Sequence, residues 1–179
     1  MSVKWKSGCA VILLAGAYSG ASAFDSTTLE LLTGNQSEVI RLGLRSPTNV
    51  KFAPFPQSKV TLAWQYSLAY WRENRPENDP SRSESLIDLG LTPIWRLGSP
   101  NAAGWYGEAG IGAHILSKHY NNNGREFSTK FQFASHLGGG YAFEDHWMLA
   151  VKVEHVSNGG IKHPNPGANF IGVQIGRRF

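Results

Sequence analysis

Residues 147–157 read Trp-Met-Leu-Ala-Val-Lys-Val-Glu-His-Val-Ser, and large apolar side chains alternate along this stretch with small or charged ones. The odd positions from Trp147 to Val153 are apolar, whereas the even positions include Lys152 and Glu154. Side chains of a β-strand point alternately to its two faces. The pattern therefore predicts a strand with one apolar face and one polar face.

The same alternation recurs through most of the chain, separated by stretches rich in Gly, Pro, Asn and Ser. We expect eight strands, at Thr28–Thr33, Glu38–Arg45, Thr61–Arg72, Ser85–Trp95, Trp105–Leu116, Phe127–Phe143, Trp147–Ser157 and Asn169–Phe179. A strand of about ten residues, tilted by about 45°, crosses an apolar band of about 25 Å. The pattern predicts an all-β fold, an eight-stranded antiparallel up-and-down transmembrane β-barrel with lipid outside and a polar, filled interior.

Composition narrows the classes of protein. Hydrophobic residues make up 41% of the 179 residues, and no run of 18 apolar residues occurs, which excludes a helical multi-span membrane protein. The net charge is +4, without a basic cluster dense enough to track nucleic acid, so we expect no nucleic-acid partner.

The N-terminal 23 residues have the features of a secretory signal peptide. Lys4 and Lys6 precede the short apolar run Cys9–Ala17, and Ala21–Ala23 forms an A-x-A cleavage site. We expect residues 24–179 to form the barrel and, because an exported barrel of this kind belongs there, to lie in the outer membrane of a Gram-negative bacterium. The single cysteine leaves with the signal, and no His, Asp or Glu spacing resembles a metal site, so we expect no cofactor.

An even strand number puts both termini at the same side of the membrane. With periplasmic termini, the longer loops are external and the shorter turns internal; the external loops are 73–84, 117–126 and 158–168, and the internal turns 96–104 and 144–146. The connection 46–60 breaks this trend, because it is long and would be periplasmic.

The opposite arrangement, a soluble barrel with its apolar side inward, remains an alternative from alternation alone. Tryptophans near the strand ends favour the membrane, where they would form an aromatic girdle: Trp71, Trp95, Trp105 and Trp147. Arg41, Arg45, Asp88, Glu108, His114 and Gln174 lie on the less apolar sides and are expected in the interior.

Two hydrogen-bonding side chains end the apolar row of residues 147–157. His155 and Ser157 point the same way, with Cα atoms about 7 Å apart. A histidine beside a serine is the minimal pair for nucleophilic acyl transfer. Asn169 begins the next strand and could bond the far ring nitrogen, while the loop between them holds glycine amides and asparagine side chains suited to an oxyanion hole. Taken alone, the pair also fits a histidine and a serine that lie at the membrane interface and take no part in catalysis.

The stretch His155–Gly167 resembles the terminal motif of the PagL family, H-x-S-N-x-G-[LI]-K-x-P-N-x-G. This is a family of outer-membrane lipid A 3-O-deacylases, and the resemblance implies an eight-stranded barrel that hydrolyses the ester-linked 3-hydroxyacyl chain at the 3-position of lipid A, the lipid of lipopolysaccharide. It further implies roles for five residues: His155 as general base, Ser157 as nucleophile, Asn158 as support, and Gly160 with Asn165 as the oxyanion hole.

One position departs from the family. Where the family has its acidic triad member, two residues after the motif glycine, this chain has Asn169. Glu154 has the parity of the interior, and Glu38 and Glu126 lie in other segments. We therefore expect a Ser-His-Asn arrangement.

Two other classes remain open. One is a non-catalytic structural or adhesive outer-membrane barrel that lost activity with its acid, and the other is a soluble lipid carrier. The sequence also leaves open the acyl-chain preference and the oligomeric state, a homodimer included.

Overall fold

The computed structural model describes residues 23–52, 60–73, 85–98, 103–122 and 125–179. Its strands are β1 (Ser26–Gly34), β2 (Ser37–Phe52), β3 (Val60–Glu73), β4 (Ser85–Leu97), β5 (Gly104–Leu116), β6 (Asn121–Asn122), β7 (Arg125–Glu126), β8 (Phe131–Ala142), β9 (Trp147–Ser157) and β10 (Ala168–Arg178). The predicted signal segment lies outside the described residues except for its last position.

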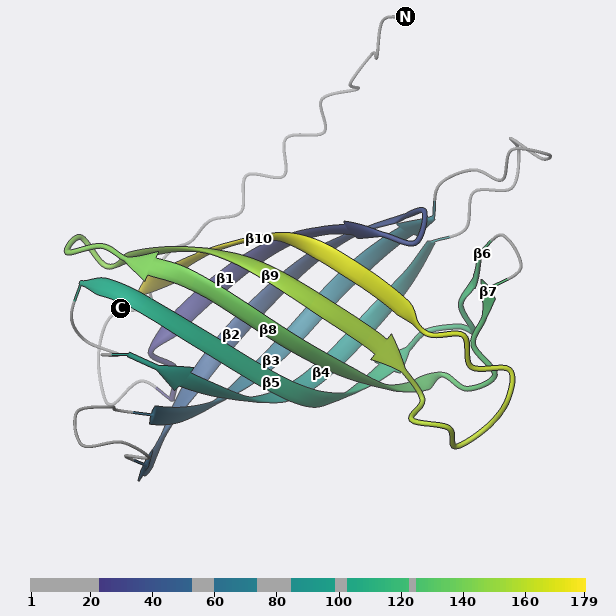
Figure 1. The fold of residues 1–179 in the computed structure, drawn as a ribbon, viewed down its shortest axis with the longest axis horizontal. Coiled ribbons are helices and arrows are strands. Elements are labelled where there is room, and N and C mark those ends of the chain that lie inside the picture. The colour runs from purple at the N-terminus through teal and green to yellow at the C-terminus, as the bar shows by residue number, and fades with distance from the viewer. Residues whose placement is uncertain (1–22, 53–59, 74–84, 99–102, 123–124) are drawn as a thin grey trace, which may run out of the picture.

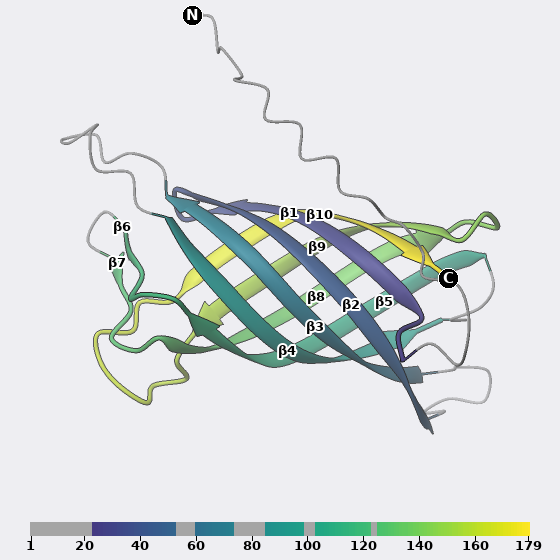
Figure 2. The same ribbon diagram turned by 180° about the vertical axis from the view of Figure 1, so that it is seen from behind.

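Eight of the strands close into an antiparallel barrel in the order β1-β10-β9-β8-β5-β4-β3-β2, as Figures 1 and 2 show from two sides. This confirms the predicted all-β, eight-stranded fold. None of the described residues forms a helix long and apolar enough to cross a membrane. We call the end that carries β6, β7 and residues 158–167 the loop end, and the opposite end, where the C-terminus lies, the terminal end.

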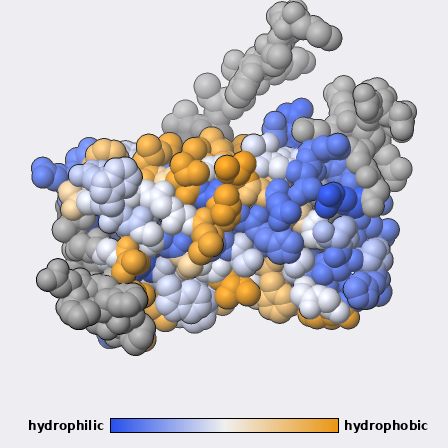
Figure 3. Space-filling view, in the orientation of Figure 1, coloured by the Kyte–Doolittle hydropathy of each residue, from blue (hydrophilic) through white to orange (hydrophobic). Residues whose placement is uncertain are grey.

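The predicted alternation sets the two faces of the barrel wall. In β9, Met148, Ala150 and Lys152 are buried, whereas Leu149 and Val151 are exposed. Figure 3 shows apolar side chains gathered in the middle of one outer face, with hydrophilic ones at the loop end. The apolar side therefore faces outward, as a lipid-facing wall requires, and the soluble arrangement with an apolar interior is wrong.

Paired charges fill the interior. Arg41 donates to Glu30 at 2.9 Å and to both Glu154 oxygens at 2.7 Å, and Lys152 reaches Glu30 at 2.8 Å. Nearer the terminal end, the Arg45 guanidinium forms a two-pronged bond with Glu108, both distances being 3.0 Å. Buried charges need partners of this kind, because their desolvation is costly.

Interior residues of several strands complete this network. His114 bonds Asp88 through Nδ1 at 2.9 Å, and the second interior histidine, His136, is also buried. The polar interior side was thus predicted correctly from alternation at Arg41, Arg45, Asp88, Glu108, His114 and Gln174, all of which are buried.

The connection 46–60 is shorter than the sequence analysis predicted. Residues 46–52 continue β2, with a shift in the pairing with β3 between Pro47 and Lys51. The long periplasmic connection was therefore wrong, because a proline and an irregular register hid a strand extension. The hairpin of β6 and β7, inside the loop that follows β5, was not predicted.

An aromatic cluster, which we call the plug, closes the barrel at the loop end. Trp71, Tyr120 and Phe127 are fully buried, and the Trp71 ring packs edge-on against Tyr120 at 5.8 Å and Phe170 at 5.0 Å. Burial raises the pKa of the Tyr120 phenol. Two predictions were wrong here: Trp71 is not part of a girdle, and Phe127 is neither in a strand nor on the lipid side.

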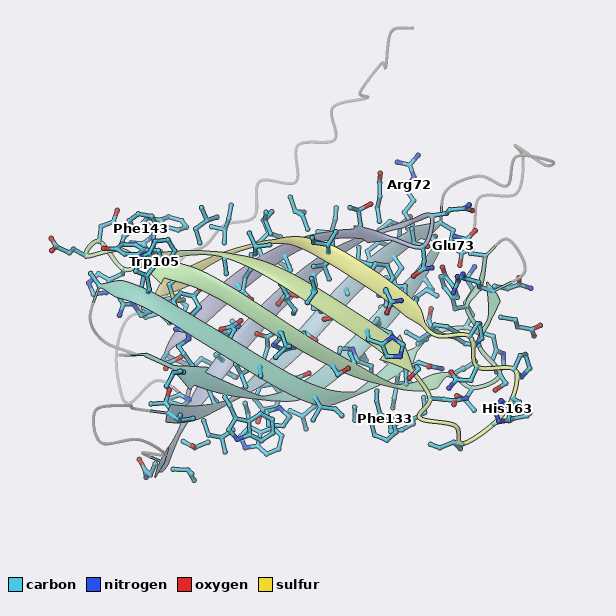
Figure 4. The ribbon with its side chains drawn as sticks, viewed as in Figure 1. Arg72, Glu73, Trp105, Phe133, Phe143 and His163 are labelled. Carbon is cyan, nitrogen blue, oxygen red and sulfur yellow. The ribbon has the colours of Figure 1, made fainter. Side chains whose placement is uncertain are left out.

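Outward aromatic residues lie near both ends: Tyr70 and Phe131 are exposed near the loop end, and two tryptophans are exposed at the terminal end. Trp105 is 81% exposed and packs edge-on against Tyr141, and Trp95 is also exposed. Figure 4 shows Trp105 beside Phe143 at this end, far from Phe133 and His163. Exposed aromatic residues of the kind that form an interfacial girdle are therefore present, but Trp71 is not among them.

Candidate active site

The pairing of β9 with β10 brings two predicted site residues face to face. His155 and Asn169 are direct partners in the ladder, both exposed on the outer wall. His155 Nδ1 and Asn169 Oδ1 are 2.7 Å apart. Because an amide oxygen can only accept, Nδ1 carries the hydrogen and Nε2 keeps its lone pair. His155 is thus set up as a base at Nε2.

Backbone contacts fix the position of this pair. A Cβ added to Gly167 would lie 2.7 Å from Cε1 of His155, so the ring edge rests directly on this glycine. Asn35 Oδ1, in the β1–β2 turn, accepts a hydrogen bond from the Asn169 backbone amide. Gly34 lies so close to β10 that an added Cβ would be 2.0 Å from the Asn169 carbonyl oxygen. The start of β10 is thus held from both neighbouring strands.

Ser157 is the last residue of β9 and shares the outer face of His155. It lies opposite Phe133 of β8, whose ring also borders Gly159, where an added Cβ would be 3.2 Å away. Within the described residues, no hydrogen bond joins the Ser157 hydroxyl to His155. Hydrogen bonds between a nucleophile and its base are often long before substrate binds, and here the two side chains share the outer face of β9, two residues apart.

Asn158 organises the loop that follows. Its side chain is fully buried, and its Nδ2 donates to Lys162 O at 2.7 Å and Ser128 Oγ at 3.2 Å. Its Oδ1 accepts from the Gly160 amide at 2.9 Å, and its backbone amide donates to Asn165 Oδ1 at 3.1 Å. The three predicted supporting residues are therefore joined in one hydrogen-bonded unit, centred on Asn158.

The two predicted oxyanion donors differ in whether their N–H groups are already hydrogen-bonded. The Gly160 amide is already bonded to Asn158 Oδ1, so it must exchange or share this partner to serve an oxyanion. The Asn165 oxygen is also used, which leaves its Nδ2 hydrogens directed elsewhere; they have no hydrogen-bond acceptor within the described residues. Of the two, the Asn165 side chain is the readier donor.

None of the three acidic residues considered from the sequence takes the place of Asn169 beside His155 within the described residues. Glu154 points into the interior and is bonded to Arg41, as its parity predicted. Glu38 lies exposed on β2, and Glu126 lies in β7; within the described residues neither forms a hydrogen bond with His155. No three His, Cys, Asp or Glu side chains come together in the described part of the chain to hold a metal ion.

Sequence reasoning missed two groups of supporting residues. Asn35 could have been suspected, because an Asn-Gln pair between two alternating segments is suited to a two-residue turn; both residues have positive φ, 48° and 58°. Ser128 and Arg125, which contact the loop 158–167 from the segment after β6, gave no local signal.

Comparison of this sequence with known proteins points to one family. The family model described as lipid A 3-O-deacylase (PagL) matches residues 38–178. A protein of Bordetella bronchiseptica named lipid A deacylase PagL is 37% identical over 122 residues, 68% of this chain and 64% of that protein. The chain thus spans less than two thirds of that relative. A protein of the same name from Pseudomonas aeruginosa is 22% identical over 149 residues, 83% of each chain.

Solved structures share the fold. The crystal structure of the outer membrane enzyme PagL superposes with a TM-score of 0.72 at 19% identity, covering 86% of this chain and 99% of that one. Neisserial surface protein A (NspA) superposes with a TM-score of 0.53 at 13% identity, covering 90% and 100%. Both likenesses support the eight-stranded barrel.

Proposed function

The chain belongs to the PagL family of lipid A 3-O-deacylases, and from this membership and the arrangement of its site we propose that it is an outer-membrane hydrolase that removes the ester-linked 3-hydroxyacyl chain from the 3-position of lipid A. The observation that carries the proposal is the bond of 2.7 Å between His155 Nδ1 and Asn169 Oδ1. It fixes a histidine base on the outer wall, two residues from a serine.

The position of the site suits a lipid substrate. Below His155, towards the terminal end, the outer wall continues with Val153, Val151 and Ile171, all exposed. Acyl chains can lie along this wall while the ester reaches the loop end. Lipid A occupies the outer leaflet, which the loop end meets when the termini are periplasmic. The exposed Arg125 and Lys162 flank the site and offer positive charge to its phosphates.

The reaction follows from these side chains. Ser157 Oγ attacks the ester carbonyl carbon while His155 Nε2 takes its proton. The oxyanion that forms accepts hydrogen bonds from Asn165 Nδ2 and the Gly160 amide, and donors of this kind contribute about 3 kcal/mol each. His155 returns the proton to the departing sugar oxygen, which leaves an acyl-serine. Water then attacks, with His155 again as base, and releases the 3-hydroxy fatty acid.

The test is the mass of lipid A from cells that make lipopolysaccharide, with and without this protein. The wild-type chain should remove one 3-hydroxyacyl mass, whereas Ser157→Ala should leave lipid A intact and the barrel folded, as judged by heat-modifiable gel mobility. Ser85→Ala is a matched control, because Ser85 is an exposed serine at the loop end of β4, away from the site.

Two results would contradict the proposal. Unchanged lipid A in the presence of the folded wild-type protein would favour the non-catalytic barrel. Continued release by Ser157→Ala would remove Ser157 as the nucleophile.

A further inference from the structure

We propose that Ser128, which lies outside the motif after β9, is a positioning residue for the oxyanion donors. Its hydroxyl holds the buried Asn158 side chain, whose Oδ1 bonds the Gly160 amide, and through Lys162 O it also holds the loop that carries Asn165. The inference rests on the proposed function and extends it to a segment that contributes none of the reacting groups.

The loop 158–167 needs an external support. Gly159 and Gly160 both have positive φ, 67° and 83°, and the side chains of Lys162 and His163 are exposed. Its internal order comes from Asn158, as described above. A loop with few buried side chains has little packing to hold it to the precision that catalysis requires.

Ser128 supplies three contacts to this loop. Its backbone amide donates to Pro164 O at 3.2 Å, and its hydroxyl donates to Lys162 O at 2.8 Å. The same hydroxyl oxygen accepts from Asn158 Nδ2 at 3.2 Å. One oxygen thus bonds both the side chain at the loop's start and a carbonyl four residues later.

The plug makes Ser128 a fixed point. Phe127, its neighbour, is fully buried against Tyr120, with ring centroids 4.7 Å apart, and its amide donates to Tyr120 O at 2.9 Å. The Tyr120 hydroxyl is bonded to Ser37 at the start of β2. The segment that presents Ser128 is therefore anchored to the wall of the barrel through Phe127 and Tyr120.

The Ser128 hydroxyl is one of three groups that fix which way the Asn158 amide faces, together with Lys162 O and the Gly160 amide. Nδ2 has two hydrogens, and its two acceptors are Ser128 Oγ and Lys162 O. With both satisfied, Oδ1 must face the Gly160 amide. Removing the hydroxyl leaves a buried N–H without its acceptor, which favours rotation of the amide and movement of the loop.

The experiment compares Ser128→Ala with two other variants, Ser128→Thr and Thr129→Ala. In Ser128→Ala, kcat for fatty-acid release should fall roughly ten- to a hundredfold with KM nearly unchanged, because only the transition state loses interactions. Ser128→Thr keeps a hydroxyl that can donate and accept, and should retain most of the wild-type kcat. Thr129→Ala is the matched control, because the Thr129 hydroxyl bonds only Phe131 O and Gln132 within the described residues.

A second measurement separates this inference from the proposed function. The Gly160 backbone amide, observed by NMR in detergent micelles, should shift in Ser128→Ala and keep its position in Ser128→Thr and Thr129→Ala. If the wild-type protein released no fatty acid, the proposed function would fail while the amide shift still tested the positioning.

A folded Ser128→Ala with wild-type kcat, or with an unmoved Gly160 amide, would overturn the inference. Should Ser128→Ala not fold, Ser128→Cys, with its weakly bonding thiol, takes its place and must give a smaller effect in the same direction.

Discussion

At the scale of single residues, the site depends on an amide in the place of a carboxylate. Asn169 Oδ1 accepts from His155 Nδ1, so it fixes the same tautomer that a carboxylate would fix. In the reaction proposed above, it does not neutralise the imidazolium that forms when His155 takes the serine proton. In serine proteases, changing the acid to an amide lowers kcat by about 10⁴-fold, although an asparagine orients the histidine in Cys-His-Asn proteases.

Asn169→Asp should therefore raise kcat. Aspartate has the shape of asparagine, keeps an oxygen near Nδ1, and adds the charge that stabilises the imidazolium; we expect an increase of at least about tenfold. Asn169→Ala should lower kcat, because nothing then selects the tautomer. Steady-state release of 3-hydroxy fatty acid measures both variants. Wild-type kcat in Asn169→Ala would mean that Asn169 does not orient His155.

At the scale of elements, the contact of the β1–β2 hairpin with β10 sets the position of Asn169. Gly34 allows the two backbones to meet at a distance that no side chain permits, and Asn35 then reaches the Asn169 amide. Asn122, from β6, donates to Gln36 O at 2.9 Å and holds this turn from above. Three separate segments thus meet beside Asn169.

Gly34→Ala should push β10 away from β1. The added methyl would lie 2.0 Å from the Asn169 oxygen, and overpacking of this kind costs about 1–3 kcal/mol. We expect a lower midpoint of urea unfolding in micelles, followed by tryptophan fluorescence, together with reduced kcat. In Gly139→Ala the new methyl would come no closer than 3.8 Å to Tyr106 O, so both quantities should match the wild type. Equal midpoints for the two variants would disprove the close contact.

At the scale of the whole molecule, the interior is a packed ion network rather than a channel. Arg41 is its hub, because it contacts Glu30 and Glu154 directly and lies 3.8 Å from Asp88. All four side chains are almost completely buried. Removing one partner of such a set leaves uncompensated charge, which destabilises strongly.

Arg41→Leu should lower the free energy of unfolding by about 3–5 kcal/mol. Urea titration of the micelle-bound protein gives this value, with Arg72→Leu as the control, since Arg72 is exposed at the end of β3. A midpoint for Arg41→Leu equal to that of Arg72→Leu would mean that the network adds nothing to stability.

How well each feature could be predicted depends on how far apart in the sequence its contacting residues lie. Alternation is local, so it predicted β9 from Trp147 to Ser157 and the shared outer face of His155 and Asn169. Trp71 was also within reach, because it has the parity of Ser67 and Ala69, which are buried. The prediction placed Trp71 in the girdle because it lies near a strand end, although its place in the alternation pointed to the interior.

Other features depend on contacts between distant segments. Phe127 enters the barrel mouth only because Tyr120 and Trp71 are there to receive it. The bonds of Ser128 to the loop 158–167 likewise depend on how two loops meet. The alternation within one segment does not show which distant segments will come into contact.

The closing seam of the barrel has a consequence for biogenesis. His155 lies on β9, but its partner Asn169 lies on β10, and Asn35 reaches that partner only where β1 pairs with β10. A precursor in transit, or a barrel still open at this seam, lacks the assembled base. The paired His155 and Asn169 side chains are therefore completed only when β10 joins both β9 and β1, so the arrangement proposed for hydrolysis arises with the closure of the barrel.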